Sequence, residues 1–219
     1  MEHDTEIAPD ANALAAMAAS YVLALAKAAV VARGRFTFAV SGGHTPWAMF
    51  AALRAEYMPW DNVDLYQVDE RVAPDGDPDR NLTHLRESIG DVPARVHPMP
   101  VNDADLDGGA AAYAADLPER FDLMHLGLGP DGHTASLVPG DPVLGVTDRL
   151  VAVTQPYQGH PRMTLTYPAL SRADQLLWLV TGPDKQVPMA QLLAGDESIP
   201  AGRVRATRSL IMADQSAAP

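Results

Sequence analysis

The residues best suited to chemistry lie in the stretch FDLMHLGLGPDGHTASLVP, residues 121–139. Its first half is an apolar run typical of a buried strand, and the glycine-rich turn that follows contains Asp131 and His133. Imidazole titrates near neutral pH, and ligands of open α/β sheets bind at the carboxyl ends of the strands. His133 is therefore a candidate functional residue, and Asp131, two residues away, is a group that can orient its ring or shift its pKa. The alternative is that His133 only caps a short helix that begins at Thr134.

A second glycine turn follows the apolar run at residues 35–40 and precedes a helical pattern at 47–53. Its polar and small residues are Ser41, Gly42, Gly43 and Thr45. Thr45 precedes a proline, and this pair predicts Thr45 as the helix N-cap. Free N–H groups at such a turn and helix start bind anions such as phosphate. A tight turn without a ligand is the alternative, and the lysine and spacing of a nucleotide-binding P-loop are missing.

Charged residues follow two more predicted strands. Asp69, Glu70 and Arg71 come after the strand predicted at 62–68, and Lys185 comes after the one predicted at 175–180. Their position at carboxyl ends of strands favours Arg71 as an anion contact and Asp69 as a polar or acid–base group, although solvated loop charges would look the same. Lys185 is one of only two lysines in the chain, at a junction that suits a point charge on phosphate.

The composition limits the functions open to the chain. With 219 residues, 47% of them hydrophobic, residues 1–219 are predicted to form a single domain, with about 1–10 and 214–219 flexible. A net charge of -12 argues against binding to nucleic acid, which requires a basic surface. Cysteine is absent, so no disulfide, thiol nucleophile or cysteine metal site is possible, and a cytoplasmic location is expected.

The alanine-rich stretch at residues 14–32 is long and apolar enough to raise the question of a membrane span. It contains Ser20 and Lys27, and the acidic N-terminus before it is unlike a secretion signal. We therefore predict a helix of a soluble domain and no membrane association. The residues predicted to form its packing face are Leu14, Met17, Tyr21, Leu25 and Ala28.

The order of the apolar runs predicts an α/β fold. Strand, turn and helix patterns alternate along most of the chain, which is typical of a mostly parallel sheet with helices on both faces. Two short strands at 150–154 and 163–167 are joined by too few residues for a helical crossover, so they are expected to be antiparallel.

Three other motifs were considered and rejected. Gly127, Gly129 and Gly132 satisfy the dinucleotide-binding pattern, but Pro139 ends the following element too early for the helix that the pattern requires. The histidines and aspartate at 125, 131 and 133 lack an established metal-ligand spacing, so no metal site is predicted. Ser41 is not in the Gly-x-Ser-x-Gly turn of a serine hydrolase.

Taken together, five motifs in series resemble the 6-phosphogluconolactonase family over about residues 14–212. They are SGGHTP from Ser41, DER from Asp69, the loop that ends near Asn81, GPDGHTASL from Gly129, and RMTLT from Arg162. The resemblance implies a three-layer, Rossmann-like α/β fold and hydrolysis of 6-phospho-D-glucono-1,5-lactone in the pentose phosphate pathway, with neither metal nor other cofactor. It implies that His133 is the general base. The substrate- and phosphate-binding residues predicted from the motifs are Ser41, Gly42, Gly43, Thr45, Asp69, Arg71, Asn81, Arg162 and Lys185.

The sequence departs from this family pattern in two places. A Lys-Pro-Pro segment usually precedes the arginine at 162, where this chain has residues 157–161 reading YQGHP, and Arg80 stands where serine is common. The related glucosamine-6-phosphate deaminases and isomerases have a glutamate five residues after the motif histidine, where this chain has Val138. They also tend to have tyrosine in place of Arg71. The lactonase is favoured over such an enzyme and over a non-catalytic sugar-phosphate sensor. The expected partner is a small phosphosugar lactone, and the expected assembly is a monomer or homodimer.

Overall fold

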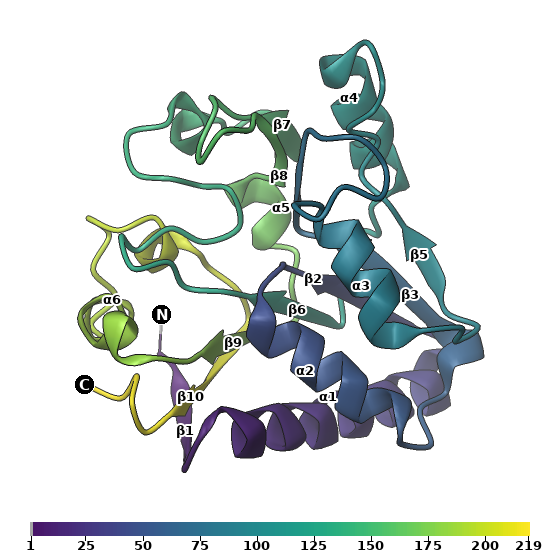
Figure 1. Cartoon of the computed structure of the whole chain (residues 1–219), viewed down its shortest axis with the longest axis vertical. Helices are drawn as coiled ribbons and strands as arrows, with labels where there is room; N and C mark the ends of the chain where they lie inside the picture. The colour runs from purple at the N-terminus through teal and green to yellow at the C-terminus, as the bar shows by residue number, and fades with distance from the viewer. Residues whose placement is uncertain (1) are drawn as a thin grey trace.

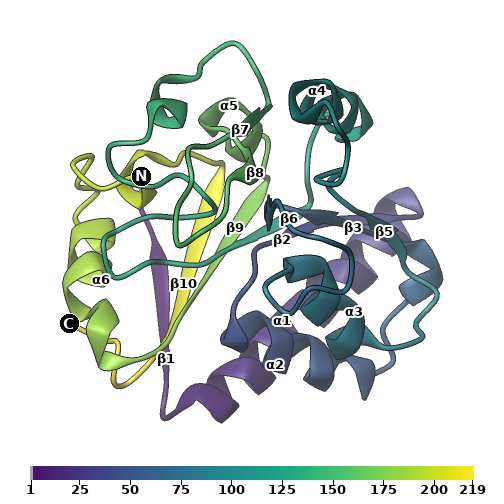
Figure 2. The same cartoon turned by 45° about the horizontal axis from the view of Figure 1, so that its top comes forward.

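The structure, a computed structural model, describes residues 2–219 and is built around one seven-stranded parallel sheet (Figures 1 and 2). All neighbouring strands of this sheet are parallel. Across the sheet the order is β1 (Asp4–Ala8), β10 (Arg208–Asp214), β9 (Gln175–Val180), β6 (Leu123–Leu126), β2 (Phe36–Val40), β3 (Val63–Gln67) and β5 (Arg95–His97). The carboxyl ends of the strands therefore meet at one edge, where the predicted site residues follow them.

Two hydrophobic clusters cover the two faces of the sheet. Alternate side chains of β6 divide between them, because Leu123 faces one cluster whereas Met124 and Leu126 face the other. The first face is covered by α1 (Ala11–Arg33), α2 (His44–Arg54) and α3 (Asn81–Ile89), and the second by α4 (Leu106–Asp116), α5 (Tyr167–Leu170) and α6 (Gln186–Leu193). Short 3-10 helices occur at η1 (Trp60–Asn62), η2 (Pro142–Gly145), η3 (Pro183–Lys185) and η4 (Ala201–Arg203). The predicted layers of the α/β fold are confirmed.

A small antiparallel sheet lies with the second cluster, in the order β4 (Asp69–Arg71), β8 (Arg162–Leu165) and β7 (Val151–Val153). Its antiparallel β7–β8 pair was predicted. The charged residues at 69–71 were expected in a loop, but they form β4, which pairs with β8 so that Arg71 lies opposite Arg162. Three charged residues alone carry no hydrophobic alternation, so the strand was not visible in the sequence.

The helix α1 is held at both ends by recognisable caps. The Asp10 side chain accepts a hydrogen bond from the Ala13 N–H, and Gly34 ends the helix in the left-handed conformation at φ 76°. By length and composition the helix could cross a membrane, but one side of it packs on the sheet. The predicted packing face is right for Leu14, which is buried, and wrong for Ala28, which is exposed, whereas Met17, Tyr21 and Leu25 are partly buried against the cluster. The buried residues are Leu14, Ala15, Ala18, Ala19, Val22, Ala26 and Ala29, mostly small side chains that let the helix approach the strands closely.

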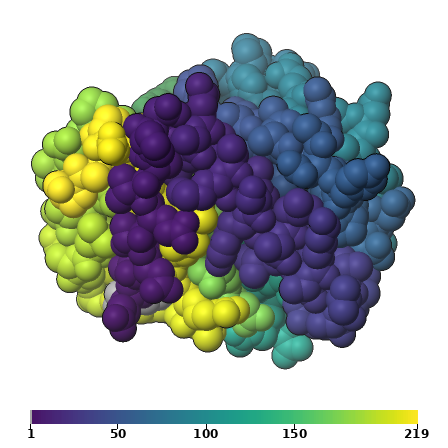
Figure 3. All heavy atoms as spheres, turned by 90° about the horizontal axis from the view of Figure 1, so that it is seen from below, coloured from purple at the N-terminus to yellow at the C-terminus, as the bar shows by residue number. Residues whose placement is uncertain are grey.

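Both ends of the chain are part of the fold. The prediction that residues before about 11 are flexible is wrong for Asp4–Ala8, which form β1 and pair with β10. At the other end, the Gln215 N–H donates to the Ala8 carbonyl, and Ala217 is buried. Met1 lies outside the described residues. Figure 3 shows the purple N-terminal and yellow C-terminal residues side by side on one surface of the molecule. Edge pairing of a polar strand such as DTEIA is a tertiary effect that its sequence does not reveal.

Candidate active site

A cavity of roughly 240 Å³ opens at the carboxyl edge of the central strands. All the predicted site residues except Asp131 and Thr45 line it. The lining residues are Ser41, Gly42, Gly43, Asp69, Arg71, Asn81, Gly127, Leu128, Gly129, Pro130, His133, Ala135, Arg162 and Lys185. Side chains from six separate segments of the chain thus meet in one place, as the parallel topology requires.

The imidazole of His133 is paired with the carboxylate of Asp131. The Nδ1 atom of His133 lies 2.5 Å from Oδ1 of Asp131, and the His133 backbone N–H donates to the same oxygen at 3.1 Å. Burial raises the pKa of Asp131, but the hydrogen bonds and the charge of His133 outweigh burial and hold that pKa below its usual range. The carboxylate is therefore ionised near neutral pH. It binds Nδ1 and so orients the ring, whereas Nε2 makes no contact with Asp131.

The glycines of this turn make room for the imidazole. A Cβ atom on Gly129 would lie 2.1 Å from Nδ1 of His133, so no larger residue fits beside the ring. Gly132 adopts φ 78°, and the Gly129 N–H donates to the His133 carbonyl at 2.8 Å. No helix begins at Thr134, which instead forms an isolated bridge with Leu137. The alternative in which His133 merely caps a helix is therefore wrong.

Gly129→Ala is expected to displace the imidazole without unfolding the protein. Misplacement of a reacting group by about 1 Å costs on the order of 10²-fold in rate, so kcat should fall by about 10- to 100-fold. The matched control is Gly145→Ala, because Gly145 has ordinary backbone angles and no atom within 4 Å of an added Cβ. Steady-state kinetics on both variants, with thermal unfolding as a check on the fold, measures this. Equal kcat in the two variants would show that the close approach is unimportant.

The Ser41–Gly43 turn leads directly into α2. Gly42 is required because an added Cβ would lie 2.0 Å from Oδ1 of Asn81, and Gly43 adopts φ 138° as the N-cap residue. No side chain caps the helix start, so amide N–H groups there are open to an anion. The predicted N-cap role of Thr45 is wrong, since the N-cap is Gly43 and the helix begins at His44, two residues earlier than predicted.

Thr45 lies outside the first cavity. Its hydroxyl is hydrogen-bonded to that of Thr181 at 3.0 Å, and it lines a neighbouring cavity of roughly 360 Å³. The residues common to both cavities are Gly42, Gly43, Gly127, Leu128 and Lys185. Thr45 therefore lies beside the first cavity, beyond the turn that the two cavities share.

The small sheet contributes two arginines and a carboxylate. Burial raises the pKa of Asp69, whose Oδ2 accepts a hydrogen bond from the Ser136 hydroxyl at 2.7 Å. Arg162 is only 4% exposed, and burial lowers its pKa, partly offset by the charge of Asp69. Arg71 donates to Oδ1 of Asn81 at 3.0 Å and to the Asp79 carbonyl at 2.7 Å. Two neighbouring guanidinium groups and one carboxylate leave positive charge facing the cavity.

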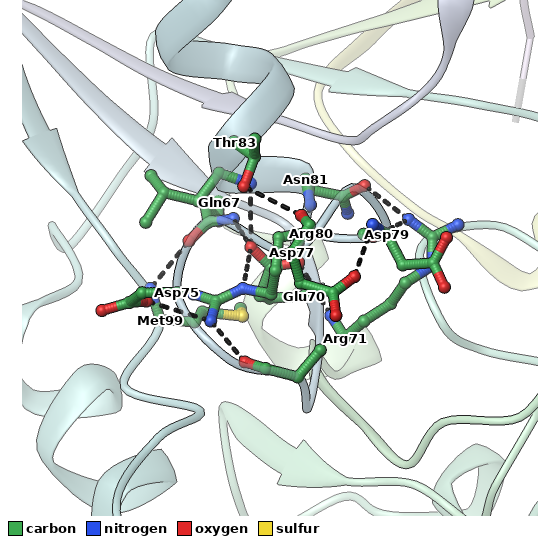
Figure 4. Close-up of polar contacts among 12 residues, drawn as sticks. Gln67, Glu70, Arg71, Asp75, Asp77, Asp79, Arg80, Asn81, Thr83 and Met99 are labelled. Atoms are coloured by element: carbon green, nitrogen blue, oxygen red, sulfur yellow. Dashed lines mark hydrogen bonds and ion pairs between the residues drawn. The ribbon is translucent and has the colours of Figure 1, made fainter.

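A fully buried carboxylate, Glu70, holds this corner together. Its oxygens accept hydrogen bonds from the backbone N–H groups of Arg71, Asn81 and Leu82, each at 2.8 Å, and from the Gln67 amide. Nε of Arg80 lies 3.0 Å away as an ion-pair partner, although the N–H is not aligned as a hydrogen bond. Figure 4 shows this network. The arginine that replaces the usual serine thus neutralises Glu70 behind the cavity.

Arg80→Ala is expected to destabilise the fold by about 3 kcal/mol, because removing one partner of a buried ion pair leaves the other charge uncompensated. Arg86→Ala is the matched control, since Arg86 lies on α3, the helix that follows Arg80, and is exposed. Urea unfolding of both variants gives the free energies. If the two variants lost the same free energy of unfolding, within about 0.5 kcal/mol, Arg80 would not stabilise the fold by neutralising Glu70.

Lys185 ends the 3-10 turn η3, just before α6. Its Nζ lies 2.8 Å from Oδ2 of Asp184, and the lysine side chain is 19% exposed. The hydrogen bond from Lys185 lowers the pKa of Asp184. Lys185 lines both cavities together with Gly42 and Gly43, so its ammonium group is placed to contact an anion bound at the start of α2.

Two polar atoms that line the first cavity have no hydrogen-bond partner among the described residues. They are Oγ of Ser41 and Nε of Arg162, both buried. Buried polar atoms are nearly always paired, so this pair indicates that the cavity accepts a polar ligand. Within residues 2–219 no group of three or more His, Asp or Glu side chains is arranged to hold a metal ion.

Four residues that shape the site were not predicted. Ser136 lies in the GPDGHTASL motif and Glu70 in the DER motif, so their positions in the sequence already indicated that they lie near the site. Arg80 was noted only as a departure from the family pattern. Tyr157 lies in the other segment noted as a departure, but its contact with His133, 24 residues away in the chain, depends on the tertiary placement of a hairpin.

Comparisons with known proteins find similarity over most of the chain. A family model described as glucosamine-6-phosphate isomerases/6-phosphogluconolactonase matches residues 9–212. The 6-phosphogluconolactonase of Mycobacterium tuberculosis is 36% identical over 242 aligned positions, spanning 100% of this chain and 98% of that protein. The one from Nostoc sp. is 35% identical over 208 positions, or 89% of this chain and 86% of the relative. The crystal structure of a 6-phosphogluconolactonase from Shewanella baltica has a TM-score of 0.88 at 26% identity and covers 97% and 98% of the two chains.

Proposed function

Because the chain belongs to the glucosamine-6-phosphate isomerase/6-phosphogluconolactonase family, within its 6-phosphogluconolactonase branch, we propose that His133 is the general base of a lactone hydrolase. The activity of the chain is hydrolysis of 6-phospho-D-glucono-1,5-lactone to 6-phospho-D-gluconate, a step of the pentose phosphate pathway. The observation that supports the proposed roles is the shared cavity, where a carboxylate-paired imidazole and three cationic side chains meet.

The proposed reaction begins with water bound between His133 and C1 of the lactone. Nε2 of His133 takes a proton from the water while the water oxygen attacks C1, and the carbonyl oxygen of the lactone becomes an oxyanion. Arg71 and the Gly42 and Gly43 amides line the cavity and supply donors for that charge. The bond from C1 to the ring oxygen then breaks. His133 returns its proton to that oxygen, which leaves as the 5-hydroxyl, and the new carboxyl group ionises.

The phosphate is proposed to bind at the opposite end of the substrate. Lys185, Arg162 and the amides at the start of α2 supply the charge and donors for it. Binding a part of the substrate that does not react fixes the lactone carbonyl against the base, which lowers the entropic cost of the reaction. Asp69 is left as a buried acceptor for a sugar hydroxyl, and Asn81 positions Arg71.

The family model also covers glucosamine-6-phosphate isomerases, which provide the alternative function. Val138 stands where those enzymes have a glutamate, so the proton relay for ring opening has no carboxylate there. A spectrophotometric assay of freshly made lactone, corrected for spontaneous hydrolysis, separates the possibilities. We expect accelerated hydrolysis and no ammonia from glucosamine 6-phosphate. Tight binding of 6-phosphogluconate without any acceleration would instead indicate a sugar-phosphate sensor.

We also propose a cytoplasmic location and a monomeric or homodimeric assembly. A chain with no cysteine forms no disulfide, which suits a reducing compartment. Light scattering on the purified protein distinguishes the two assemblies.

A further inference from the structure

The loop that departs from the family pattern ends in a defined hairpin tip at residues 157–160. The Tyr157 N–H donates to the His160 carbonyl at 2.9 Å, and the reverse bond measures 3.3 Å. Gln158 and Gly159 between them have φ angles of 52° and 90°. Two central residues with positive φ are the mark of a tight two-residue hairpin turn. This tip extends the β7–β8 pair, because the Thr154 N–H also donates to the Arg162 carbonyl.

The Tyr157 ring touches three groups of the active site. Its ring centre lies 5.6 Å from that of His133 in an edge-to-face arrangement. Its hydroxyl lies 3.5 Å from Oδ2 of Asp131, the carboxylate that pairs with the imidazole. The guanidinium of Arg162 lies over the ring face at 5.1 Å, a cation–π distance, and Nη2 of Arg162 donates to the Tyr157 carbonyl at 3.4 Å.

The other end of the hairpin tip is tied to the segment that carries Arg71. The His160 ring nitrogens lie 3.3 Å from the Val72 carbonyl and 3.1 Å from Oδ2 of Asp79. The Val72 N–H donates to the Pro161 carbonyl at 3.0 Å, and Arg71 itself donates to the Asp79 carbonyl. The tip therefore joins the two sides of the cavity, one with His133 and one with the arginines.

Burial raises the pKa of Tyr157, and the charge of Asp131 raises it further. The phenol therefore stays protonated and acts as a donor toward that carboxylate. Asp131 is thus bound by the imidazole at Oδ1 and faces the phenol, at a longer distance, at Oδ2.

We infer that Tyr157 is a positioning residue of the lactonase, which fixes the ring of His133 against its substrate and holds Arg162 at the same time. This inference rests on the proposed role of His133 as the base. The aromatic ring itself, through edge contact and cation–π contact, is the larger part of the effect, because the hydroxyl contact at 3.5 Å is long for a hydrogen bond.

The test compares Tyr157→Leu with Tyr157→Phe. The leucine variant removes the aromatic ring, so kcat should fall by about 10- to 100-fold, as expected when a reacting group loses its orientation. The phenylalanine variant keeps the ring and should stay within about threefold of the native kcat, because it loses only one long contact. Tyr57→Leu is the matched control, since Tyr57 is 94% exposed. Tyr157→Met serves as a second ring-free variant if the leucine variant melts early. Native kcat in a folded, ring-free variant would overturn the inference.

A double-mutant cycle separates positioning from a general structural role. If Tyr157 acts through His133, Tyr157→Leu should cause no further loss of kcat in a His133→Ala background. Additive losses of kcat would mean that Tyr157 does not affect turnover through His133 and would overturn the inference. Native turnover in the His133→Ala single variant would instead refute the proposed base, so the two failures are distinguishable.

Discussion

Replacing His133 with alanine is expected to lower kcat for 6-phosphogluconolactone by about 10²- to 10⁴-fold, the contribution of a positioned general base. The physical reason is that water at neutral pH is a poor nucleophile unless a neutral imidazole removes its proton. In the structure, only Nδ1 of that ring is engaged by Asp131, which leaves Nε2 for water. The affinity for 6-phosphogluconate should change little, because the charges that hold the phosphate are elsewhere in the cavity.

This prediction is measured by initial rates corrected for spontaneous lactone hydrolysis, together with calorimetric titration of 6-phosphogluconate. His84→Ala is a suitable control, since His84 lies on α3, is 41% exposed and lines neither the first nor the second cavity. A His133→Ala protein that turns over fresh lactone at the native rate would show that another group activates water.

Lys185→Met is expected to raise KM for the phosphorylated lactone by about 10- to 100-fold, because a hydrogen bond to a charged group is worth about 1.5–3 kcal/mol. Turnover of unphosphorylated glucono-1,5-lactone should be unchanged, since that substrate has no phosphate for the lysine to bind. The ratio of kcat/KM values for the two substrates is therefore the quantity to measure.

The chain itself offers the control for this variant. Lys27, its only other lysine, is exposed on α1, so Lys27→Met makes the same change of charge far from the cavity. If Lys185→Met lowered kcat/KM equally for both substrates, the lysine would stabilise the fold or contact the lactone ring and would not bind the phosphate.

Much of the fold was predictable because its strands are buried on both faces. Apolar runs such as Gln175–Val180 and Phe36–Val40 are read from sequence without knowledge of their partners. The site followed from the same logic, since glycines and charges after such runs must gather at one edge of a parallel sheet. Lys185 and His133 were placed in this way although 52 residues separate them in the sequence.

The features that the sequence did not reveal depend on tertiary contacts. The edge strand Asp4–Ala8 has no apolar run and exists through its pairing with β10. Thr45 was predicted as the N-cap from local preference, but the N-cap is Gly43, two residues earlier. Glu70 and Arg80 neutralise each other behind the cavity, an arrangement that depends on burial of both. Local pattern thus predicts the buried strands, whereas an edge strand, the exact start of a helix and pairs of distant side chains depend on the fold.

The central claim is that the imidazole of His133 and the ammonium of Lys185 act on opposite ends of one substrate. A crystal structure with 6-phosphogluconate bound tests it most directly. The account predicts the C1 carboxylate beside Nε2 of His133 and the phosphate in contact with Lys185 and the amides at the start of α2. A complex with the phosphate against His133, or with the ligand outside this cavity, would contradict it.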